Sequence, residues 1–221
     1  MDSGLTAESS EARRQPFLRG WRLVATASLL ALAVLLVIRS FFYDVYYIPS
    51  ASMEPTYEPG DRLIVSKQSG HIERGSVVVF DGTGSFSPYQ SGSPWVRDPL
   101  GTAGQWLGLV GSDTVYIKRV IGVGGDTVEC CDSEGYLLVN GQRLEEPYLP
   151  QGESASDVSF SVQVPEGRIW LMGDNRSNSA DSRALLGAPG GGMVRVDKVI
   201  GSPVYTVWPL NKIGPSSTTP D

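Results

Sequence analysis

Two residues of this chain have the type and setting for covalent chemistry, a serine behind an apolar segment and a lysine in a β-branched run. Ser52 stands in the sequence Pro-Ser-Ala-Ser-Met-Glu-Pro. A serine hydroxyl becomes a useful nucleophile only when a neighbouring base takes its proton. Histidine is the usual base, but the single histidine, His71, lies in a polar, turn-like stretch and is expected to be a solvated surface residue. Lysine is a known alternative, so these residues favour a serine hydrolase that uses lysine.

Only one of the four lysines has surroundings that suit a base. Lys67, Lys198 and Lys212 lie in polar, charged or Pro/Ser-rich segments and are expected to be solvated ammonium groups. Lys118 falls in the β-branched run 115–121, which predicts a buried strand. Burial lowers the pKa of a lysine, and a base needs that shift to be neutral near pH 7. From the pattern alone, a lysine that extends its ammonium group to solvent is equally consistent.

The composition bounds the class of protein. A chain of 221 residues with 41% apolar residues can build one sizeable core. The 26 glycines and 15 prolines predict many turns, which favours a β-rich body over a helical bundle. The net charge of −6, without a basic stripe, argues against a nucleic-acid partner.

An apolar segment near the N-terminus predicts a transmembrane helix over residues 21–43. Residues 23–38 are uncharged, and Trp21 and the aromatic residues 41–43 extend the apolar length towards the roughly 20 residues that a bilayer requires. A buried core helix and a cleaved signal peptide are the alternatives. A cleavage site needs small residues, and cutting within residues 50–52 would destroy the candidate nucleophile. We therefore expect an uncleaved anchor.

The charges beside the anchor predict its orientation. The polar N-terminal segment 1–20 and its border carry four arginines and are expected to stay in the cytoplasm. These are Arg13, Arg14, Arg19 and Arg22. The body from about residue 44 then lies on the extracytoplasmic side, with aromatic residues 41–47 at the outer membrane interface.

Periodicity and turn residues divide the body into short strands. Strands are predicted at 62–66, 76–80, 114–121, 127–130, 136–139, 168–172 and 199–207. Asn140-Gly141 is a strong hairpin signal. Residues 81–113 are rich in Gly, Ser and Pro and then become more apolar, with Trp95 and Trp106. They predict a loop across the surface, and packing of its tryptophans on the body is favoured over contact with the membrane interface.

Two further segments carry dense polar or sulfur chemistry. Residues 173–183 follow an apolar strand and combine small, acidic and basic residues, which predicts a loop held by Asx turns and Asp–Arg pairs. Cys130 and Cys131 are adjacent, with no histidine or acidic cluster near them, so they do not indicate a metal site. Free thiols and a local disulfide bridge both stay open.

Together the segments resemble the type I signal peptidases, the membrane-bound Ser/Lys proteases that remove signal peptides from exported proteins. Five blocks behind the anchor match the family in order and spacing. The blocks are residues 49–56, 60–61, 74–80, 116–126 and 173–183. The family fold is mainly β, an antiparallel catalytic core with a smaller inserted β region. The resemblance implies a cytoplasmic segment 1–20, an anchor 21–43, a catalytic core 44–126 and 165–213, an insertion 127–164 and a disordered tail 214–221.

The resemblance also implies a role for each matching residue. Ser52 is the nucleophile and Lys118 the general base. The hydroxyl of Ser50 joins the backbone N–H of Ser52 in an oxyanion hole, a donor set aimed at the charge that develops on the carbonyl oxygen. Ser179 orients the lysine amine, and Asp181 with Arg183 forms an ion pair that supports the loop.

Other matching positions line shallow pockets for small residues at the first and third positions before the cut. They are Tyr46, Ile48, Met53, Tyr116 and Ile117. Two positions depart from the commonest family pattern, because Ala51 stands where glycine is frequent and Ser177 where aspartate is frequent. Neither is a catalytic position.

The implied activity is cleavage of signal peptides from secretory preproteins after Ala-x-Ala, at the cell membrane and near the export translocon. Lipid is a further implied partner, and no metal or organic cofactor is required. Two alternatives remain. A self-cleaving repressor-type Ser/Lys protease would be expected to lack the anchor, and a membrane-tethered adaptor would not react with a serine acylator at Ser52.

Overall fold

The computed structural model describes residues 17–68, 72–87, 98–150 and 152–216. Contacts divide the chain into two compact units, Met1–Ser40 and Phe41–Asp221. His71, Trp95 and residues 1–16 and 217–221, on which some of the sequence predictions fall, lie outside the described residues.

The first unit is essentially one helix, α1 (Phe17–Phe41). Its stretch Gly20–Phe41 is long and apolar enough to cross a membrane, and no part of it is buried within the protein. At 1.5 Å per residue, 22 residues extend about 33 Å, which matches the hydrocarbon thickness of a bilayer. The helix ends two residues before the limit of the predicted anchor 21–43, because Tyr43 already belongs to a strand. The bounds of the anchor stay a prediction.

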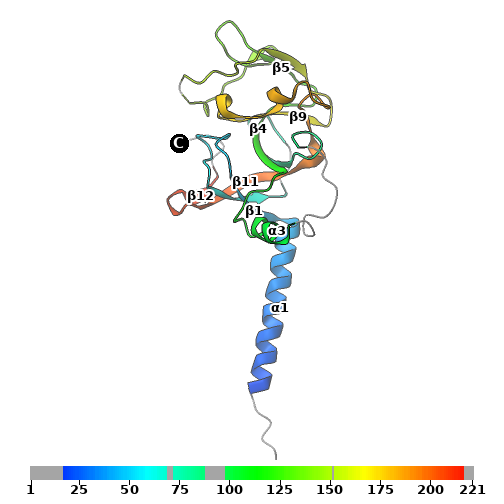
Figure 1. The fold of residues 1–221 in the computed structure, drawn as a ribbon, viewed down its shortest axis with the longest axis vertical. Coiled ribbons are helices and arrows are strands. Elements are labelled where there is room, and N and C mark those ends of the chain that lie inside the picture. The colour runs from blue at the N-terminus through cyan, green and yellow to red at the C-terminus, as the bar shows by residue number, and fades with distance from the viewer. Residues whose placement is uncertain (1–16, 69–71, 88–97, 151, 217–221) are drawn as a thin grey trace, which may run out of the picture. The chain divides into compact units, whose positions relative to one another are not determined.

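The second unit is the mainly β body that was predicted, with two antiparallel sheets (Figure 1). The larger, eight-stranded sheet has the order β1-β2-β11-β3-β4-β9-β10, and β12 pairs with β11. Its strands are β1 (Tyr43–Tyr47), β2 (Arg62–Ser66), β3 (Val77–Asp81), β4 (Val115–Val123), β9 (Arg168–Met172), β10 (Val194–Arg195), β11 (Val199–Trp208) and β12 (Gly214–Pro215).

The smaller, four-stranded sheet has the order β7-β6-β5-β8. Its strands are β5 (Thr127–Cys130), β6 (Leu138–Val139), β7 (Gln142–Arg143) and β8 (Phe160–Gln163). Asn140 and Gly141 connect β6 to β7 as the hairpin signal predicted, and Asn140 adopts the positive φ of 54° that this turn type needs. The domain boundaries proposed for the insertion, 127–164, stay a prediction.

The large sheet is buried on both faces where β3 and β4 run through it. Along β3, Val77 and Val79 belong to one hydrophobic cluster while Val78 and Phe80 belong to another. A third cluster, around Trp170, joins the large sheet to the small one. Because successive side chains of a strand point to opposite faces, the apolar run in β4 is buried whichever way each side chain points.

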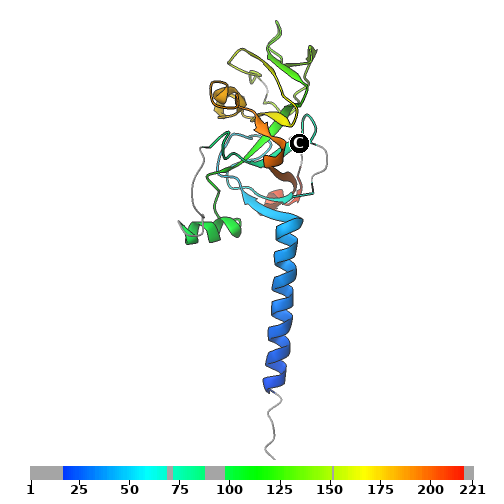
Figure 2. The same cartoon turned by 90° about the vertical axis from the view of Figure 1, so that its right-hand side faces the viewer.

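Short helices complete the body. They are the α-helix α3 (Pro99–Trp106) and the 3-10 helices η1 (Arg176–Asn178), η2 (Ser182–Leu185), η3 (Val196–Lys198) and η4 (Leu210–Lys212). Figure 2 shows α3 as a separate short helix beside the sheet. The prediction of a plain loop over 81–113 is therefore wrong for this part, where Asp98 caps the helix by accepting a hydrogen bond from the Gly101 backbone N–H.

Two further findings go beyond what the sequence predicted. Tyr43–Tyr47, part of the aromatic run 41–47, forms β1, in register with β2 from Tyr43 opposite Ser66 to Tyr47 opposite Arg62. The position of this run at a membrane interface stays a prediction. Cys130 and Cys131, which the sequence left open, form a disulfide with each other.

Candidate active site

Ser52 lies in a tight turn that follows β1. Backbone hydrogen bonds from Ile48 N to Asp61 O and from Gly60 N to Ile48 O close the segment at its base. The turn is also tied to the loop after β9, because Asn175 donates its backbone N–H to the Ser52 carbonyl at 3.2 Å and its side-chain amide to the Ala51 carbonyl at 3.0 Å. The Ser52 side chain is thereby held in a buried position, 7% exposed.

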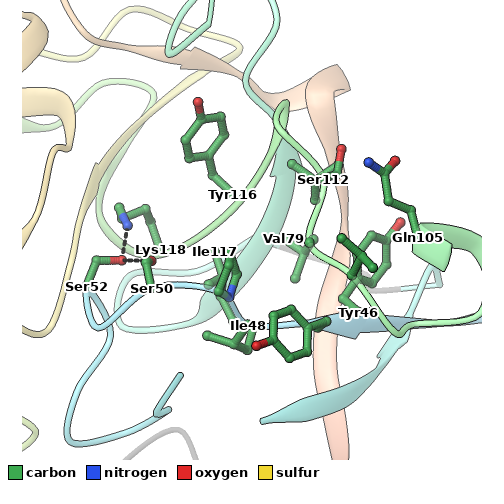
Figure 3. Close-up of a pocket in the computed structure, with 15 residues that line it drawn as sticks. Tyr46, Ile48, Ser50, Ser52, Val79, Gln105, Ser112, Tyr116, Ile117 and Lys118 are labelled. Carbon is green, nitrogen blue, oxygen red and sulfur yellow. Dashed lines mark hydrogen bonds between the residues drawn. The ribbon is translucent and has the colours of Figure 1, made fainter. Parts of the chain in front are cut away.

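Lys118 reaches the same point from the middle of β4. It lies opposite Val78 of β3 and shares its face with Tyr116 and Val120, which belong to one hydrophobic cluster. Its side chain is 3% exposed, and its Nζ lies 2.5 Å from the Oγ of Ser52 (Figure 3). The snorkelling alternative is therefore excluded. Two groups 66 residues apart in the chain meet in a buried hydrogen bond.

The environment of Lys118 favours its neutral amine. Burial is the largest influence and, against the attraction of Asp181 and Asp174, lowers the pKa of Lys118 to about 8 from its ordinary 10.5. Both carboxylates are engaged by arginines. Asp181 accepts from Arg183 and Asp174 accepts from Arg119, and the positive charge of Arg183 adds to the lowering of the Lys118 pKa.

The three other lysines have the opposite setting. Lys67 pairs with Asp44, Lys198 with Asp81, and Lys212 with Glu58. All three are partly exposed, at 22–34% of the side-chain area. These pairs are more ordered than the solvated ammonium groups that the sequence predicted, and each nitrogen faces a carboxylate.

The predicted oxyanion donor lies beside the pair. The Oγ of Ser50 is 3.4 Å from the Oγ of Ser52, and either hydroxyl can donate to the other (Figure 3). Ser50 is more exposed than Ser52, on the side of the cavity. It is therefore free to turn towards a carbonyl group that enters from there.

Ser179 lies next to the turn of Ser52, but among the described residues no hydrogen bond joins its hydroxyl to the Lys118 amine. The buried hydroxyl instead lies near enough to Asp181 to help lower the pKa of that carboxyl. It packs against Gly173, where an added Cβ would lie 2.3 Å from the Oγ of Ser179 and 2.4 Å from the carbonyl oxygen of Ser52. Glycine is thus required where the β9 loop crosses the nucleophile turn. The lysine-orienting role of Ser179 stays a prediction.

The loop that carries Ser179 is held by buried ion pairs. Asp181 accepts from the Nε and Nη2 of Arg183 and from the backbone N–H of Gly173. Burial by itself would raise the pKa of Asp181, but the hydrogen bond and charge of Arg183 outweigh it and leave that pKa lowered. The predicted pair Asp181–Arg183 is therefore formed, and the loop stays anchored by a charged carboxylate.

Sequence reasoning missed a second clamp centred on Asp174. This fully buried carboxylate accepts from Arg119 through both oxygens, at 2.8 and 2.6 Å, and from the hydroxyl of Thr56 at 2.5 Å. Arg119 follows Lys118 in β4, and Thr56 follows Ser52 by four residues. One carboxylate thus ties the strand of the lysine to the turn of the serine. The motif Gly-Asp-Asn-Arg contained the residue, but nothing in it identified the partners.

The same loop is joined to the inserted sheet by Arg176. Its guanidinium group donates to the carboxylate of Glu146 and, at 2.7 Å, to the backbone carbonyl of Ala155. The guanidinium groups of Arg119 and Arg176 both lie over the ring of Tyr148, at 3.8 and 5.9 Å from its centroid. The segment between β7 and β8 of the small sheet therefore contributes to the support of the site.

A cavity of about 210 Å³ opens beside Ser52 and Lys118. Figure 3 shows the dyad at one end of it and Tyr46, Gln105 and Ser112 at the other. Of the five predicted pocket residues, four line the cavity, while Met53 is fully buried in the hydrophobic core. The four are Tyr46, Ile48, Tyr116 and Ile117. The wall formed by Gln105 and residues 110–112 was missed because it comes from the segment predicted to be a loop.

The walls of this cavity offer free strand edges. β1 is the terminal strand of the large sheet in its strand order, and the pairing of β4 with β9 begins only at Arg119. In the described pairings, residues 115–118 of β4 therefore bond to β3 on one side only. An extended peptide could form main-chain hydrogen bonds along either edge and present a carbonyl to Ser52. No group of three or more described His, Cys, Asp or Glu side chains is arranged to hold a metal ion.

Comparisons with known proteins identify the family. Residues 21–208 match the family model described as "Signal peptidase, peptidase S26". The chain is 38% identical over 220 residues to signal peptidase I of Mycobacterium tuberculosis, covering 86% of this chain and 73% of that protein. It is 37% identical over 223 residues to the probable signal peptidase I of Mycobacterium leprae, covering 86% and 77%. A signal peptidase I crystal structure from Enterococcus faecalis matches with a TM-score of 0.39 and 24% identity, covering 61% of this chain and 98% of that one.

Proposed function

The chain belongs to the signal peptidase family, peptidase S26, and we propose that Ser52 and Lys118 form the dyad with which it cuts peptide bonds. It is a membrane-anchored serine endopeptidase, and its substrates are preproteins that carry signal peptides. The observation that carries the proposed dyad is the 2.5 Å separation of Lys118 Nζ and Ser52 Oγ in a buried setting.

In the first half of the reaction, neutral Lys118 accepts the hydroxyl proton of Ser52 while the oxygen attacks the scissile carbonyl. The backbone N–H of Ser52 and the hydroxyl of Ser50 donate to the oxyanion that forms, a contribution of about 3 kcal/mol per donor in comparable sites. The protonated lysine then donates its proton to the leaving amine as the peptide bond breaks. The product is an ester between Ser52 and the signal peptide.

In the second half, Lys118 is again neutral and takes a proton from an incoming water, which attacks the ester. The signal peptide leaves with a free carboxylate and Ser52 recovers its proton. Asp174, Asp181 and their arginines do not exchange protons in this scheme. They keep the two reacting groups in contact, and Ser179 is proposed to orient the amine.

Substrate selection is proposed to follow from the apolar part of the cavity. An extended segment adds between Tyr46–Pro49 and Tyr116–Lys118, and small residues at the first and third positions before the cut face Ile48 and Ile117. This corresponds to cleavage after Ala-x-Ala. We further propose that the N-terminus is cytoplasmic and the body extracytoplasmic, where preproteins leave the translocon, because arginines precede the anchor.

The test uses the purified full chain in detergent with a preprotein that ends its signal in Ala-x-Ala. Ser52→Ala and Lys118→Met should each retain the fold and lower kcat by roughly 10²–10⁴-fold or more. Lys198→Met, which removes a partly exposed lysine from a surface ion pair, is the matched control and should cleave normally. Activity in Lys118→Met at the level of this control would refute the assigned base.

A further inference from the structure

Tyr116 forms a wall of the cavity on the same face of β4 as Lys118. Side chains two positions apart along a strand are about 7 Å from each other. The Tyr116 ring therefore lies one side-chain spacing from the amine that contacts Ser52, and Figure 3 shows the ring beside the dyad. A substrate residue whose carbonyl reaches Ser52 has this ring as a neighbour.

The part of β4 that carries Tyr116 has a sheet partner on one side only. In the described pairings, residues 115–118 bond to β3, and the pairing with β9 begins at Arg119. The other edge is the one that the proposed function leaves to an incoming peptide. The position of the Tyr116 ring must therefore be fixed by something other than a second neighbouring strand.

The loop that follows β3, residues 82–87, supplies this support. Three successive backbone N–H groups, those of residues 85–87, donate to the Gly82 carbonyl at 2.8–3.0 Å, so the loop is a compact turn. Gly82 in return donates its backbone N–H to the Thr114 carbonyl at 2.7 Å. This bond ties the turn to the residue directly before β4.

Both the hydroxyl and the ring of Tyr116 contact this loop. The Tyr116 hydroxyl lies 2.6 Å from the Oγ of Ser87, which in turn can donate to the Asp113 carbonyl at 3.3 Å. The Phe86 ring lies 5.5 Å from the Tyr116 ring, centroid to centroid. Gly82 is so close that an added Cβ would be 2.6 Å from a carbon of the Tyr116 ring. The ring is thus packed along its side and hydrogen-bonded at its end.

We propose that Ser87 is a positioning residue that determines specificity, because its hydrogen bond holds the Tyr116 ring where the ring limits the size of the substrate residue just before the scissile bond. A small side chain fits beside the fixed ring, whereas a branched one requires the ring to move. Ser87 does not itself line the cavity. The inference rests on the proposed function, since it concerns the substrate of the same dyad.

The test uses the full chain in detergent with two preproteins that differ only in the residue before the cut, alanine or valine. Ser87→Ala should lower the ratio of kcat/KM for the alanine substrate to kcat/KM for the valine substrate by roughly five- to tenfold, which is part of the discrimination that apolar pockets achieve per methylene group. A loss of folded enzyme lowers both rates equally, so the ratio does not report stability. Ser87→Thr retains a hydroxyl and should retain the ratio.

Ser85→Ala is the matched control, because it removes a hydroxyl from the same loop that donates to the Gly82 carbonyl and not to Tyr116. Its ratio should equal that of the unmodified enzyme. A change in Ser85→Ala as large as in Ser87→Ala would overturn the proposal, because any disturbance of the loop would then have the same effect.

A double-mutant cycle tests whether the hydrogen bond is the cause. Tyr116→Phe removes the other hydroxyl and should lower the same ratio, and Ser87→Ala added to it should lower the ratio no further. Effects that multiply in the double variant would contradict the assigned role of Ser87.

Failure of this inference differs from failure of the proposed function. An unchanged ratio in Ser87→Ala, in an enzyme that cleaves after alanine and loses this activity in Ser52→Ala, would refute the role of Ser87 and leave the dyad in place. Cleavage that survives Ser52→Ala would instead refute the dyad and, with it, the inference.

Discussion

Charge is buried in two opposite ways within a few ångströms of the active site. Arg119–Asp174, Arg183–Asp181 and Arg176–Glu146 are buried pairs in which each charge has a partner of opposite sign. Lys118 is equally buried but has only the hydroxyl of Ser52 in contact with its nitrogen among the hydrogen bonds of the described residues. The paired charges hold the loops around the site in place, whereas burial without a paired counter-ion lowers the pKa of Lys118 and makes its amine reactive in the proposed dyad. Burial thus gives rigidity where a counter-ion is present and reactivity where it is not.

The largest expected effect comes from removing a counter-ion from the compensated set. Asp174→Ala leaves the Arg119 guanidinium buried without its carboxylate, which typically costs 3–5 kcal/mol, roughly, in unfolding free energy. It also releases Thr56, so cleavage should fall with stability. Denaturant unfolding in detergent measures the loss.

Asp197→Ala is the matched control for this prediction, because it removes a carboxylate from an exposed pair with Arg195. Its effect should stay within about 0.5 kcal/mol. Comparable losses in the two variants would show that the buried pair does not hold the site together.

Lys118, the buried charge without a counter-ion, should make the stability of the protein depend on pH. Its pKa of about 8 in the folded chain lies below the ordinary 10.5, so the unfolded chain binds more protons between these values. Stability should therefore rise with pH across this window, by roughly 3 kcal/mol in total, and the burial cost is complete below pH 8. Lys118→Met should be more stable than the parent at pH 7, and this difference should shrink as the pH rises towards 10.5.

The same pKa governs the rate. Below about pH 8, kcat/KM should increase about tenfold per pH unit, because only the neutral amine can accept the Ser52 proton. Stopped-time cleavage assays across pH 6–9, roughly, measure it, with unfolding followed in parallel to separate the two effects. A rate that is flat across this range would mean that the lysine is already neutral or is not the base.

A smaller effect is expected at Gly173, where the loop of the buried ion pairs crosses the turn of Ser52. Gly173→Ala places a methyl group against Ser179 and the Ser52 carbonyl, so we expect a loss of about 1–3 kcal/mol together with reduced kcat. Gly187→Ala is the control, because nothing lies within 4 Å of its added Cβ. If Gly173→Ala retained the kcat of that control, the close crossing of the two loops would have no part in positioning the nucleophile.

The sequence indicated Ser52 and Lys118 more readily than the residues that hold them in place. The two could be proposed as a pair because few alternatives existed and because a lysine in a β-branched strand is unusual. Asp174 could not, since its partners Thr56 and Arg119 lie 118 and 55 residues away and only the fold brings them together. The Asp181–Arg183 pair could be predicted because its members are two residues apart in the sequence.

The elements of the fold that could be predicted are likewise those with a clear local sequence pattern. Strands with clear β-branched runs, such as β2 at Arg62–Ser66, match the predicted limits. β1 was missed because its aromatic residues also suit a membrane interface. α3 was missed because two of its eight residues, Gly101 and Gly104, are glycines and because its stability depends on the Asp98 cap and on packing at β1.

The register of β4 determines which of two consecutive basic residues, Lys118 or Arg119, faces Ser52. Lys118 lies opposite Val78 and Arg119 opposite Val77, so consecutive positions of one strand send a titratable amine and a permanently charged guanidinium to opposite sides. A slip of a single residue would exchange them and present to Ser52 a group that cannot give up its proton. For the proposed dyad, strand alignment, and not the presence of a lysine as such, thus decides whether Ser52 can be activated.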